Sequence, residues 1–509
     1  MKRNLLLLFF ILVKFALNFK LVNPVYELHR DEFLHLDQAN HLDFGYLSVP
    51  PLTSVFAVVI QVFGNSEFWV RFFPCLFGAL TLTVVWKTIE SLGGSWFALI
   101  LGAFSVLFSA LLRINMLFQP NSFEVLAWTF SCFAFIRYFQ SGQIRWIYFA
   151  FVSLGFGFLN KYNIAFLAIG FFVPFAFSMH RKLLLNSHFW FAALVGFAIV
   201  LPNLIWQILN GFPVIHHMKL LKETQLDNVS TADFLKEQLL YFIGEIHVMI
   251  AAIVGLLVSK SLRPYRIFVW SLISTLVIFV LLHAKGYYAI SLYPIFLAFG
   301  SVVLERRLTG KSGLILRGIS LALPVGFLVA IYPIAFPVSE PSIMKDRVAD
   351  NPDLHLARWE DGKDHDLPQD FADMLGWKEL AAKVDSALAQ LPANERTIVL
   401  CDNYGQAGAV NFYSKNRAIN AVTMNADYVN WFDLRQPIRN VVLVRENSEE
   451  NRFISRYFGF FESVYETGEI ENAFAREKGT SVYVLKSASA NINSLLQNDI
   501  ASEKQSWKN

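Results

Sequence analysis

The sequence predicts a polytopic α-helical membrane protein with an α/β domain at its C-terminal end. Among its 509 residues, 55% are hydrophobic and only 16% are charged, whereas soluble proteins carry roughly 25% charged residues. The charges are unevenly divided: residues 1–337 hold 24 basic and 14 acidic side chains, and residues 338–509 hold 19 basic and 26 acidic ones. This division predicts a membrane domain over 1–337, a water-soluble domain over 338–486 and a polar, frayed tail over 487–509.

Composition also excludes several classes of function. The net charge is only +3 and no block of lysines and arginines stands out, so nucleic acid is not an expected partner. The three cysteines, Cys75, Cys132 and Cys401, lie far apart in the sequence. Neither a cysteine metal site nor a disulfide framework is therefore expected.

Eleven apolar stretches are expected to form membrane-spanning helices, because roughly 18 apolar residues cross a bilayer core. They lie at residues 5–22, 70–87, 95–112, 122–139, 146–160, 163–178, 189–206, 239–258, 267–283, 288–304 and 317–336. Lys2 and Arg3 precede the first stretch, as in a signal peptide, but no small-residue cleavage site follows, so we expect a retained span. Residues 51–63 are apolar but too short to cross, and are predicted to form an interfacial or re-entrant juxtamembrane helix.

The loops between these stretches predict an orientation. Basic residues gather in every second loop, on the side of the N-terminus; they are Lys87, Arg137, Arg145, Arg181, Lys182, Lys260, Arg263, Arg266, Arg306, Arg307, Lys311 and Arg317. Basic loops face the cytoplasm, so the N-terminus is expected on the cytoplasmic side of the inner (plasma) membrane. An odd number of spans then places residues 338–509 outside the cytoplasm, with the loops 23–69, 113–121, 207–238 and 283–288.

The C-terminal part alternates helix and strand signals. Short β-branched runs at 397–401, 440–444 and 481–485 are bounded by polar or turn residues and predict strands. Residues 376–391 place apolar side chains at helical spacing and predict a helix. We expect a small extracytoplasmic α/β domain with a sheet of three to five strands.

The first outer loop is rich in acids. Five of the 14 acidic residues of the membrane half lie there: Glu27, Asp31, Glu32, Asp37 and Asp43. Carboxylates at a membrane face tend to be functional, but a solvated loop would hold acids too, and composition leaves both interpretations open. His29, His35 and His41 recur every six residues, which does not place them on one helical face, so metal binding there is the less favoured interpretation.

The order of several motifs resembles a known family. The first outer loop reads Arg30-Asp31-Glu32-Phe33, then His41 to Tyr46, then Pro50-Pro51-Leu52; later motifs are Arg71 to Pro74, Gly155 to Tyr162, Pro202 to Trp206, Asn210 to Phe212, His216-His217, Lys285 to Tyr288 and Tyr293-Pro294. In this order they resemble the protein-mannosyltransferase-like GT-C glycosyltransferases, which use polyprenyl-phosphate-linked sugars. More weakly, Asp402-Asn403-Tyr404 with Ala407, Phe412 and Tyr413 is similar to the extracytoplasmic domain of some members.

The resemblance implies a GT-C fold and a glycosyltransferase that moves a sugar from a polyprenyl phosphate to an acceptor hydroxyl, with inversion. Such a transfer needs a base on one side of the anomeric carbon and cationic or donor groups for the departing phosphate on the other. Asp31 matches the family's base. Glu32 is expected to position the acceptor or tune Asp31 by like-charge coupling, with the start of a helix as its structural alternative.

Fixed cations and donors near the outer face are the candidates for the phosphate. They are Lys161, Lys285, Arg71, Arg113, His216, His217 and Tyr288. Lys161 and Lys285 are favoured because each belongs to a matched motif, although lysines and arginines near span ends also snorkel. Asp43 and Tyr46, in the first-loop motif, are expected to contact the acceptor or the sugar.

One departure from the family pattern concerns Asn121. Many members carry a second Asp in a Pro-Asp-x-Pro context, where this sequence has Pro120-Asn121-Ser122-Phe123. Asn keeps hydrogen bonding but loses charge, so either Asn121 contacts sugar hydroxyls or Glu124, one helical turn on, supplies the acid. We therefore expect no obligatory metal or other cofactor, although some members use a divalent cation. The residue before Pro50 is Val49, not the Lys of the lipid A aminoarabinose transferases, so the donor sugar is not assigned.

Two other interpretations stay open. A transporter or flippase for a lipid-linked sugar would also have many spans, but such proteins tend to show internal repeats, and the Asp31-to-Pro51 loop has no second copy. A catalytically silent relative that binds glycan would explain Asn121, but Asp31 is intact. The expected partners are the bilayer, the polyprenyl-phosphate sugar, and an acceptor that is a glycan, a lipid or a protein.

Overall fold

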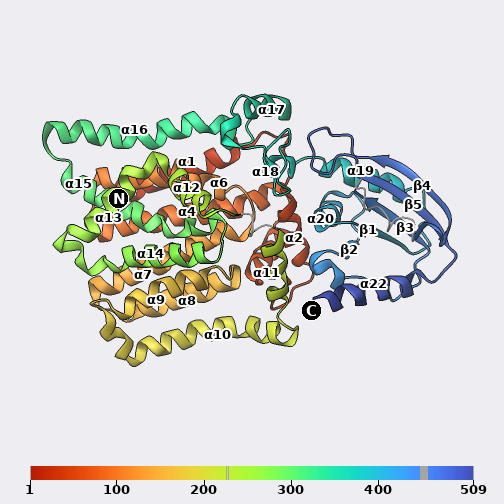
Figure 1. The fold of residues 1–509 in the computed structure, drawn as a ribbon, viewed down its shortest axis with the longest axis horizontal. Coiled ribbons are helices and arrows are strands. Elements are labelled where there is room, and N and C mark those ends of the chain that lie inside the picture. The colour runs from red at the N-terminus through yellow and green to blue at the C-terminus, as the bar shows by residue number, and fades with distance from the viewer. Residues whose placement is uncertain (1, 225, 227–228, 447–456, 508–509) are drawn as a thin grey trace.

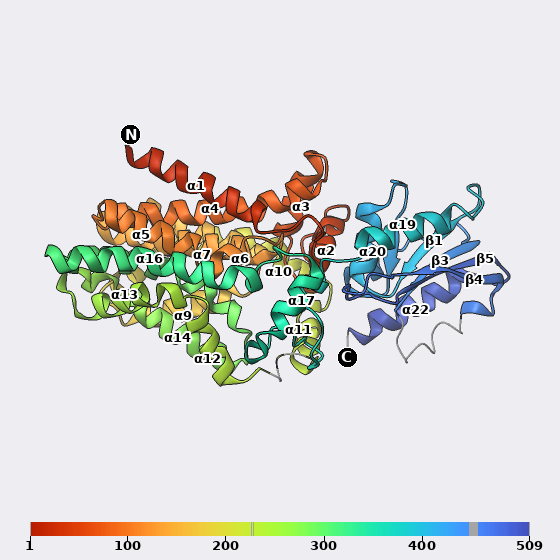
Figure 2. The same cartoon turned by 90° about the horizontal axis from the view of Figure 1, so that it is seen from above.

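The computed structural model describes residues 2–224, 226, 229–446 and 457–507. A helical half and an α/β half lie side by side along the long axis of the molecule (Figures 1 and 2). The helical half runs from α1 (Lys2–Lys20) to α16 (Gly310–Ala335), and the strands all follow residue 396. Its mostly helical character and the small C-terminal sheet agree with the predicted fold class.

A helix lies at each of the eleven predicted spans. Besides α1 and α16 they are α4 (Glu67–Ser91), α5 (Trp96–Leu107), α7 (Pro120–Ser141), α8 (Arg145–Asn160), α9 (Ile164–Ala176), α10 (Ser187–Leu209), α13 (Ile246–Val258), α14 (Ile267–Leu281) and α15 (Pro294–Arg307). By length and apolar composition, three of the described helices could each cross a membrane, or up to five if each of two bent pairs counts as one span. The number of spans and their orientation therefore stay predictions.

Shorter helices connect or flank these long ones. They are α2 (Arg30–Gln38), α3 (Leu52–Val62), α6 (Ala110–Ile114), η1 (Arg181–Leu185), α11 (Pro213–Thr224), α12 (Thr231–Leu240), η3 (Ile243–Glu245), η4 (Lys260–Tyr265), η5 (Gly286–Leu292), α17 (Pro341–Ala349) and η6 (Pro352–Leu354). The helix predicted over 51–63 is present as α3. The bends in the two broken pairs are 62° between α12 and α13, and 51° between η5 and α15.

The long helices pack closely where small residues meet. At Gly155 on α8, an added Cβ would lie 2.9 Å from the carbonyl oxygen of Gly196 on α10, and at Gly196 it would lie 2.7 Å from the carbonyl oxygen of Phe151. Because both distances are below normal contact, only glycine lets these two backbones approach so closely, as in packed membrane helices.

The C-terminal domain is a five-stranded sheet in the order β2-β1-β3-β5-β4. Its strands are β1 (Thr397–Cys401), β2 (Ala421–Thr423), β3 (Asn440–Arg445), β4 (Phe461–Glu469) and β5 (Ser481–Ala488), and its helices are α18 (Gln369–Ala372), α19 (Trp377–Leu388), α20 (Tyr404–Tyr413), η7 (Ala426–Asn430) and α22 (Ile492–Ser506). Strands β2, β1 and β3 are parallel, whereas β5 is antiparallel to β3 and β4. The three predicted strands, the predicted helix and the size of the sheet are confirmed.

The expectation of a frayed tail over 487–509 is wrong for the residues described there. Strand β5 continues to Ala488, and α22 occupies Ile492–Ser506. Ile492 and Leu496, one turn apart, are buried against the sheet, and the Asn491 side chain accepts a hydrogen bond from the backbone of Ser494 at the start of the helix. Two apolar residues and a cap are enough for a docked helix, although the segment is polar on average.

The two halves share one apolar core. Alternate residues of the central strands, including Val399 and Val442, pack with α19 and α20, and the same cluster contains Phe33 of α2. The Phe33 ring lies 5.6 Å from the ring of Trp377 on α19 and meets it edge to face. The segment that carries α2 is therefore held between the long helices and the C-terminal domain, and this places the acids of that segment.

Candidate active site

Asp31 lies in the first turn of α2, at the junction of the two halves. Tyr404, the first residue of α20, donates its hydroxyl to Asp31 Oδ1 at 2.7 Å, and Gln119 Nε2 donates to Asp31 Oδ2 at 3.1 Å. The side chain of Asp31 is still 42% exposed. One donor comes from each half of the molecule, so Asp31 is fixed in place while solvent still reaches it.

The first turn of α2, which carries Asp31, is fixed by a cap at the N-terminal end of the helix. His29 caps the helix: its Nδ1 accepts the backbone N–H of Asp31 at 3.2 Å, and Glu32 Oε2 accepts the backbone N–H of His29 at 2.7 Å. This reciprocal pair is a capping box. The other oxygen of Glu32 accepts the backbone N–H of Phe118 at 2.6 Å. Glu32 is buried and both its oxygens bind backbone, so the geometry favours the helix-start alternative for this residue.

The charge state of Asp31 follows from its surroundings. Burial raises the pKa of Asp31, but the neighbouring His29, the Tyr404 hydroxyl and Arg30 lower it by more, so that pKa lies below its ordinary value. Glu32 differs, because burial raises its pKa despite the two backbone donors. Asp31 is therefore the more acidic and the more exposed carboxylate of the pair, and it is ionised at neutral pH.

A row of hydrogen bonds connects Asp31 with Lys161. Gln119, bound to Asp31, accepts from Asn121 Nδ2 at 3.1 Å, and Asn121 Oδ1 accepts from Lys161 Nζ at 2.8 Å. Lys161 also pairs with Glu124 at 3.2 Å. Four of the residues singled out in the sequence, Asp31, Asn121, Glu124 and Lys161, thus belong to one polar network, with a carboxylate at one end and an ammonium at the other.

Tyr288 closes the cationic end of this network. Lys161 Nζ lies 4.5 Å from the centroid of the Tyr288 ring, within range of a cation–π contact. The backbone carbonyl of Tyr288 accepts from Asn163 Nδ2 at 3.0 Å, and the same Asn163 amide donates to Glu124 at 2.5 Å. The ammonium of Lys161 is therefore held between an acid and an aromatic ring.

Two other predicted cations are paired with acids of the segment between α17 and α19. Lys285 Nζ lies 2.9 Å from Glu360 Oε1, and Arg113 Nη2 lies 3.0 Å from Asp370 Oδ2. Asp370 also faces His29 Nε2 at 3.9 Å, so Arg113 lies near the N-terminal end of α2. Both acids are exposed, so each of these two cations is already paired with a carboxylate at the surface.

The remaining predicted residues lie elsewhere in the described structure. Arg71 donates to the backbone carbonyls of Tyr26 and Glu27 at 2.8 and 3.0 Å, which supports the loop before α2. His216 and His217 lie on α11, and burial together with His216 lowers the pKa of His217 to about 4. Because that pKa is low, His217 is neutral at pH 7 and carries no charge for a phosphate.

Asp43 and Tyr46 stay within the first-loop motif. Asp43 is exposed and its Oδ1 accepts the backbone N–H of Phe44 at 2.7 Å. The buried Tyr46 hydroxyl donates to the carbonyl of Gln38 at 3.0 Å. The hydroxyl of Tyr46 therefore fixes the loop, while Asp43 keeps an exposed carboxylate.

Tyr404 and Gln119 are site residues that the sequence did not single out as such. Tyr404 lies in the motif likened to an extracytoplasmic domain, but nothing in that motif indicates contact with Asp31. Arg30 stacks over the Tyr404 ring at 4.6 Å, and burial with the Asp31 charge raises the pKa of the Tyr404 hydroxyl well above its ordinary value. Tyr404 is therefore a protonated donor at neutral pH.

Further contacts clamp α2 to the C-terminal domain. Asp37 Oδ2 accepts from the Tyr428 hydroxyl at 2.6 Å and from Asn411 Nδ2 at 2.7 Å. Asp427 of the C-terminal domain accepts from Gln38 Nε2 at 3.0 Å and from the backbone N–H of Leu47 at 2.7 Å. Burial raises the pKa of Asp37 to about 7 and that of Asp427 to about 6. Two buried acids with raised pKa values thus hold the helix that carries Asp31.

Among the residues that the structure describes, no group of three or more His, Cys, Asp or Glu side chains is arranged to hold a metal ion. Next to Asp31 in the sequence, His29 Nε2 faces Asp370 at 3.9 Å and Asp373 at 3.8 Å, and Asp373 also pairs with Arg476 at 3.2 Å. The side chains near the site that could ligate a metal are therefore paired with other groups of the protein. Whether the reaction needs a divalent cation remains a prediction.

Comparison with known proteins gives a family resemblance and a fold. Residues 48–206 match the family model described as dolichyl-phosphate-mannose-protein mannosyltransferase. The resemblance to this family of GT-C glycosyltransferases is confirmed, over a segment that contains Asn121 and Lys161 and begins after Asp31. A search of curated proteins found no match.

Solved structures match over nearly the whole chain. ArnT from Cupriavidus metallidurans bound to undecaprenyl phosphate is 15% identical with a TM-score of 0.61, over 94% of this chain and 97% of that one. The same protein in the apo state is 13% identical with a TM-score of 0.63, over 97% and 99%. The archaeal oligosaccharyltransferase AglB from Archaeoglobus fulgidus, in complex with an inhibitory peptide and a dolichol-phosphate, gives 11% identity and a TM-score of 0.44, over 86% and 69%. The likeness to ArnT establishes the GT-C fold.

Proposed function

We propose that this chain transfers a sugar from a polyprenyl phosphate to an acceptor hydroxyl on the extracytoplasmic face of the inner membrane, with inversion. The observation that carries the proposal is the row of hydrogen bonds that runs from Asp31 through Gln119 and Asn121 to Lys161, here called the polar row. It presents an ionised, partly exposed carboxylate at one end and a fixed ammonium at the other. A transfer from a lipid phosphate needs these two groups on opposite sides of the reacting carbon.

The proposed reaction is a single displacement. The acceptor oxygen attacks the anomeric carbon from the face opposite the phosphate, and its proton passes to Asp31. The bond between the anomeric carbon and the phosphate oxygen breaks, and the lipid phosphate leaves with the electron pair. Tyr404 and Gln119 would hold the carboxylate toward the acceptor, and Asn121 would contact sugar hydroxyls.

Lys161 is the proposed partner of the departing phosphate. Its ammonium would exchange part of its contact with Glu124 for the phosphate as negative charge grows on the leaving oxygen. Lys285 and Arg113 would join it when Glu360 and Asp370 move away. We propose that these cations suffice and that a divalent metal is not obligatory.

The test is sugar release from a polyprenyl-phosphate sugar by the purified full-length protein in a bilayer. The anomeric configuration of the glycoside formed with an acceptor alcohol, measured by NMR, should be opposite to that of the donor. Replacement of Lys161 by Gln should weaken transfer, whereas Lys182→Gln, a change in η1 far from the polar row, should leave it unchanged. Retained configuration, or equal effects of the two substitutions, would contradict the proposal.

Transport of a lipid-linked sugar is a second candidate, supported by one observation. Two helix pairs are broken, with bends of 62° and 51°, and discontinuous helices often form substrate sites in transporters. A vesicle assay separates the candidates. Movement of a labelled lipid-linked sugar between leaflets without cleavage would favour transport, whereas release of the sugar from the lipid would favour transfer.

A further inference from the structure

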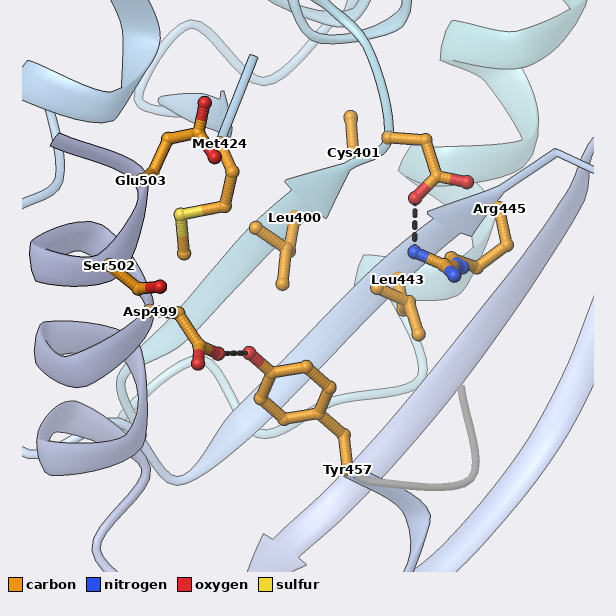
Figure 3. Close-up of a pocket in the computed structure, with 10 residues that line it drawn as sticks. Leu400, Cys401, Met424, Leu443, Arg445, Tyr457, Asp499, Ser502 and Glu503 are labelled. Carbon is orange, nitrogen blue, oxygen red and sulfur yellow. Dashed lines mark hydrogen bonds and ion pairs between the residues drawn. The ribbon is translucent and has the colours of Figure 1, made fainter. Parts of the chain in front are cut away.

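A hollow of about 310 Å³ opens on the C-terminal domain, between the sheet and α22 (Figure 3). Leu400 of β1 and Leu443 of β3 point into it from the sheet, and Met424, just after β2, lies beside them. Asp499, Ser502 and Glu503 face it from α22. Since ligand pockets are typically about 300–1,000 Å³, this volume suits a ligand no larger than one or two rings.

The position of the hollow is the one where open α/β sheets bind ligands. The chain leaves β1 toward β2 on one side, and the next parallel strand, β3, lies on the other side of β1. Ligands bind outside the carboxyl ends of strands at such a reversal of order. Asp402 is the first residue after β1, Arg445 is the last of β3, and both line the hollow.

The lining combines apolar side chains with hydrogen-bonding ones. The leucines and Met424 offer an apolar wall, while the Tyr457 hydroxyl, which donates to Asp499, and the carboxylates of Asp402, Asp499 and Glu503 offer polar groups. A sugar ring has this same division, because it carries C–H groups on its faces and hydroxyls around its edge. Carboxylates accept hydrogen bonds from such hydroxyls.

The charges decide which kind of sugar fits. Three carboxylates face the hollow and one guanidinium does, and Arg445 is already paired with Asp402. The site is therefore net negative and would repel a phosphate or carboxylate ligand. A neutral sugar or an amino sugar is compatible with these charges, whereas the anionic lipid donor is not.

The hollow is connected to Asp31 through one short turn. Asp402 lines the hollow, and Tyr404, two residues later, donates to Asp31. Asp402 Oδ2 also accepts the backbone N–H of Glu446 at 2.8 Å, which ties the turn to the end of β3. A molecule bound in the hollow would thus contact the segment that positions the proposed base.

We propose that this hollow binds a neutral or amino sugar unit of the acceptor glycan. The assignment to the acceptor rests on the proposed function, but sugar binding itself does not. The acceptor would then be held by the C-terminal domain at one of its sugars, while another of its hydroxyls reaches Asp31. This role gives the C-terminal domain a part in choosing the acceptor.

The test is saturation-transfer NMR on the full-length protein in nanodiscs. The probes are the methyl glycosides of neutral hexoses, of glucosamine and of glucuronate, together with glucose 1-phosphate itself. Ser502→Trp should fill the hollow and weaken binding of neutral or amino sugars by about tenfold or more, which is roughly 1.4 kcal/mol. Ala501→Trp introduces the same side chain at the exposed neighbouring position, outside the lining, and should leave binding unchanged.

A second variant guards against misfolding. Glu503→Gln keeps the size of the side chain and should weaken glucosamine more than the neutral sugars, because it removes one carboxylate. Absence of binding by every neutral and amino sugar, binding that Ser502→Trp leaves intact, or equal binding of the anionic sugars would each overturn the inference. Asp31→Asn should bind the probes as wild type does, so loss of transfer and loss of sugar binding report on the two proposals separately.

Discussion

Replacement of Tyr404 by Phe should change how transfer depends on pH. The substitution removes the hydroxyl that donates to Asp31 at 2.7 Å but keeps the ring under Arg30. A hydrogen bond to a charged group contributes roughly 1.5–3 kcal/mol, and one pKa unit corresponds to about 1.36 kcal/mol. Loss of this donor should therefore raise the pKa of Asp31 by roughly one to two units.

The sign of the effect follows from the role of Asp31 as base. Its pKa lies below the ordinary value, so the carboxylate is ionised across the neutral range and activity should be lost only as the pH falls through that pKa. In Tyr404→Phe the acidic limb of kcat/KM should move to higher pH by about one to two units. The assay is transfer from a polyprenyl-phosphate sugar, followed between pH 3 and pH 9.

Tyr413→Phe is the matched control. Tyr413 ends the same helix, α20, and its hydroxyl donates to a different acid of the other half, Glu67, at 2.9 Å. It should destabilise the interface to a similar extent without moving the acidic limb. A Tyr404→Phe profile that coincides with that of Tyr413→Phe would refute the argument that Tyr404 acts on Asp31.

Three further predictions follow from other contacts. Burial raises the pKa of Asp37 to about 7, which is above its unfolded value. The contribution of Asp37 to stability should therefore be full below about pH 4 and should fall by up to roughly 4 kcal/mol as the pH rises to 7. Thermal unfolding in nanodiscs should show that the stability of Asp37→Asn depends less on pH than that of wild type. Glu360→Gln should strengthen binding of a short-chain polyprenyl phosphate, measured by calorimetry, because Lys285 loses the acid at 2.9 Å, whereas Glu462→Gln on β4 should not. Treatment with EDTA should leave transfer within about threefold of the untreated rate; loss of activity that one divalent metal restores would show an obligatory metal.

The long apolar helices and the central strands could be predicted because their signals are local. A run of apolar residues or a β-branched pentamer specifies its own element, and the motifs of the first loop led directly to Asp31. The polar row was accessible in part, since Asn121, Glu124 and Lys161 belong to motifs. Its continuity through Gln119 was not, because a glutamine in a loop carries no signal of its own.

Contacts between the two halves could not be predicted from the sequence. Tyr404 and Asp31 are separated by 373 positions, and their contact depends on how the C-terminal domain docks on α2. The same holds for Lys285 with Glu360 and for Arg113 with Asp370, because snorkelling was the local alternative for these two cations and nothing in the sequence indicated their partners. Helix α22 was missed because two buried residues in a polar segment do not raise its mean hydropathy.

The central claim is that Asp31 is the general base, and the turnover of Asp31→Asn tests it most directly. Asn keeps the size and can still accept from Tyr404, but it cannot take a proton at neutral pH. General-base catalysis contributes about 10²–10⁴-fold, so turnover should fall by that factor while donor binding changes little, and Glu32→Gln should cost less than Asp31→Asn if the protein stays folded. A folded Asp31→Asn protein with turnover within about threefold of wild type, well short of that general-base factor, would contradict the account.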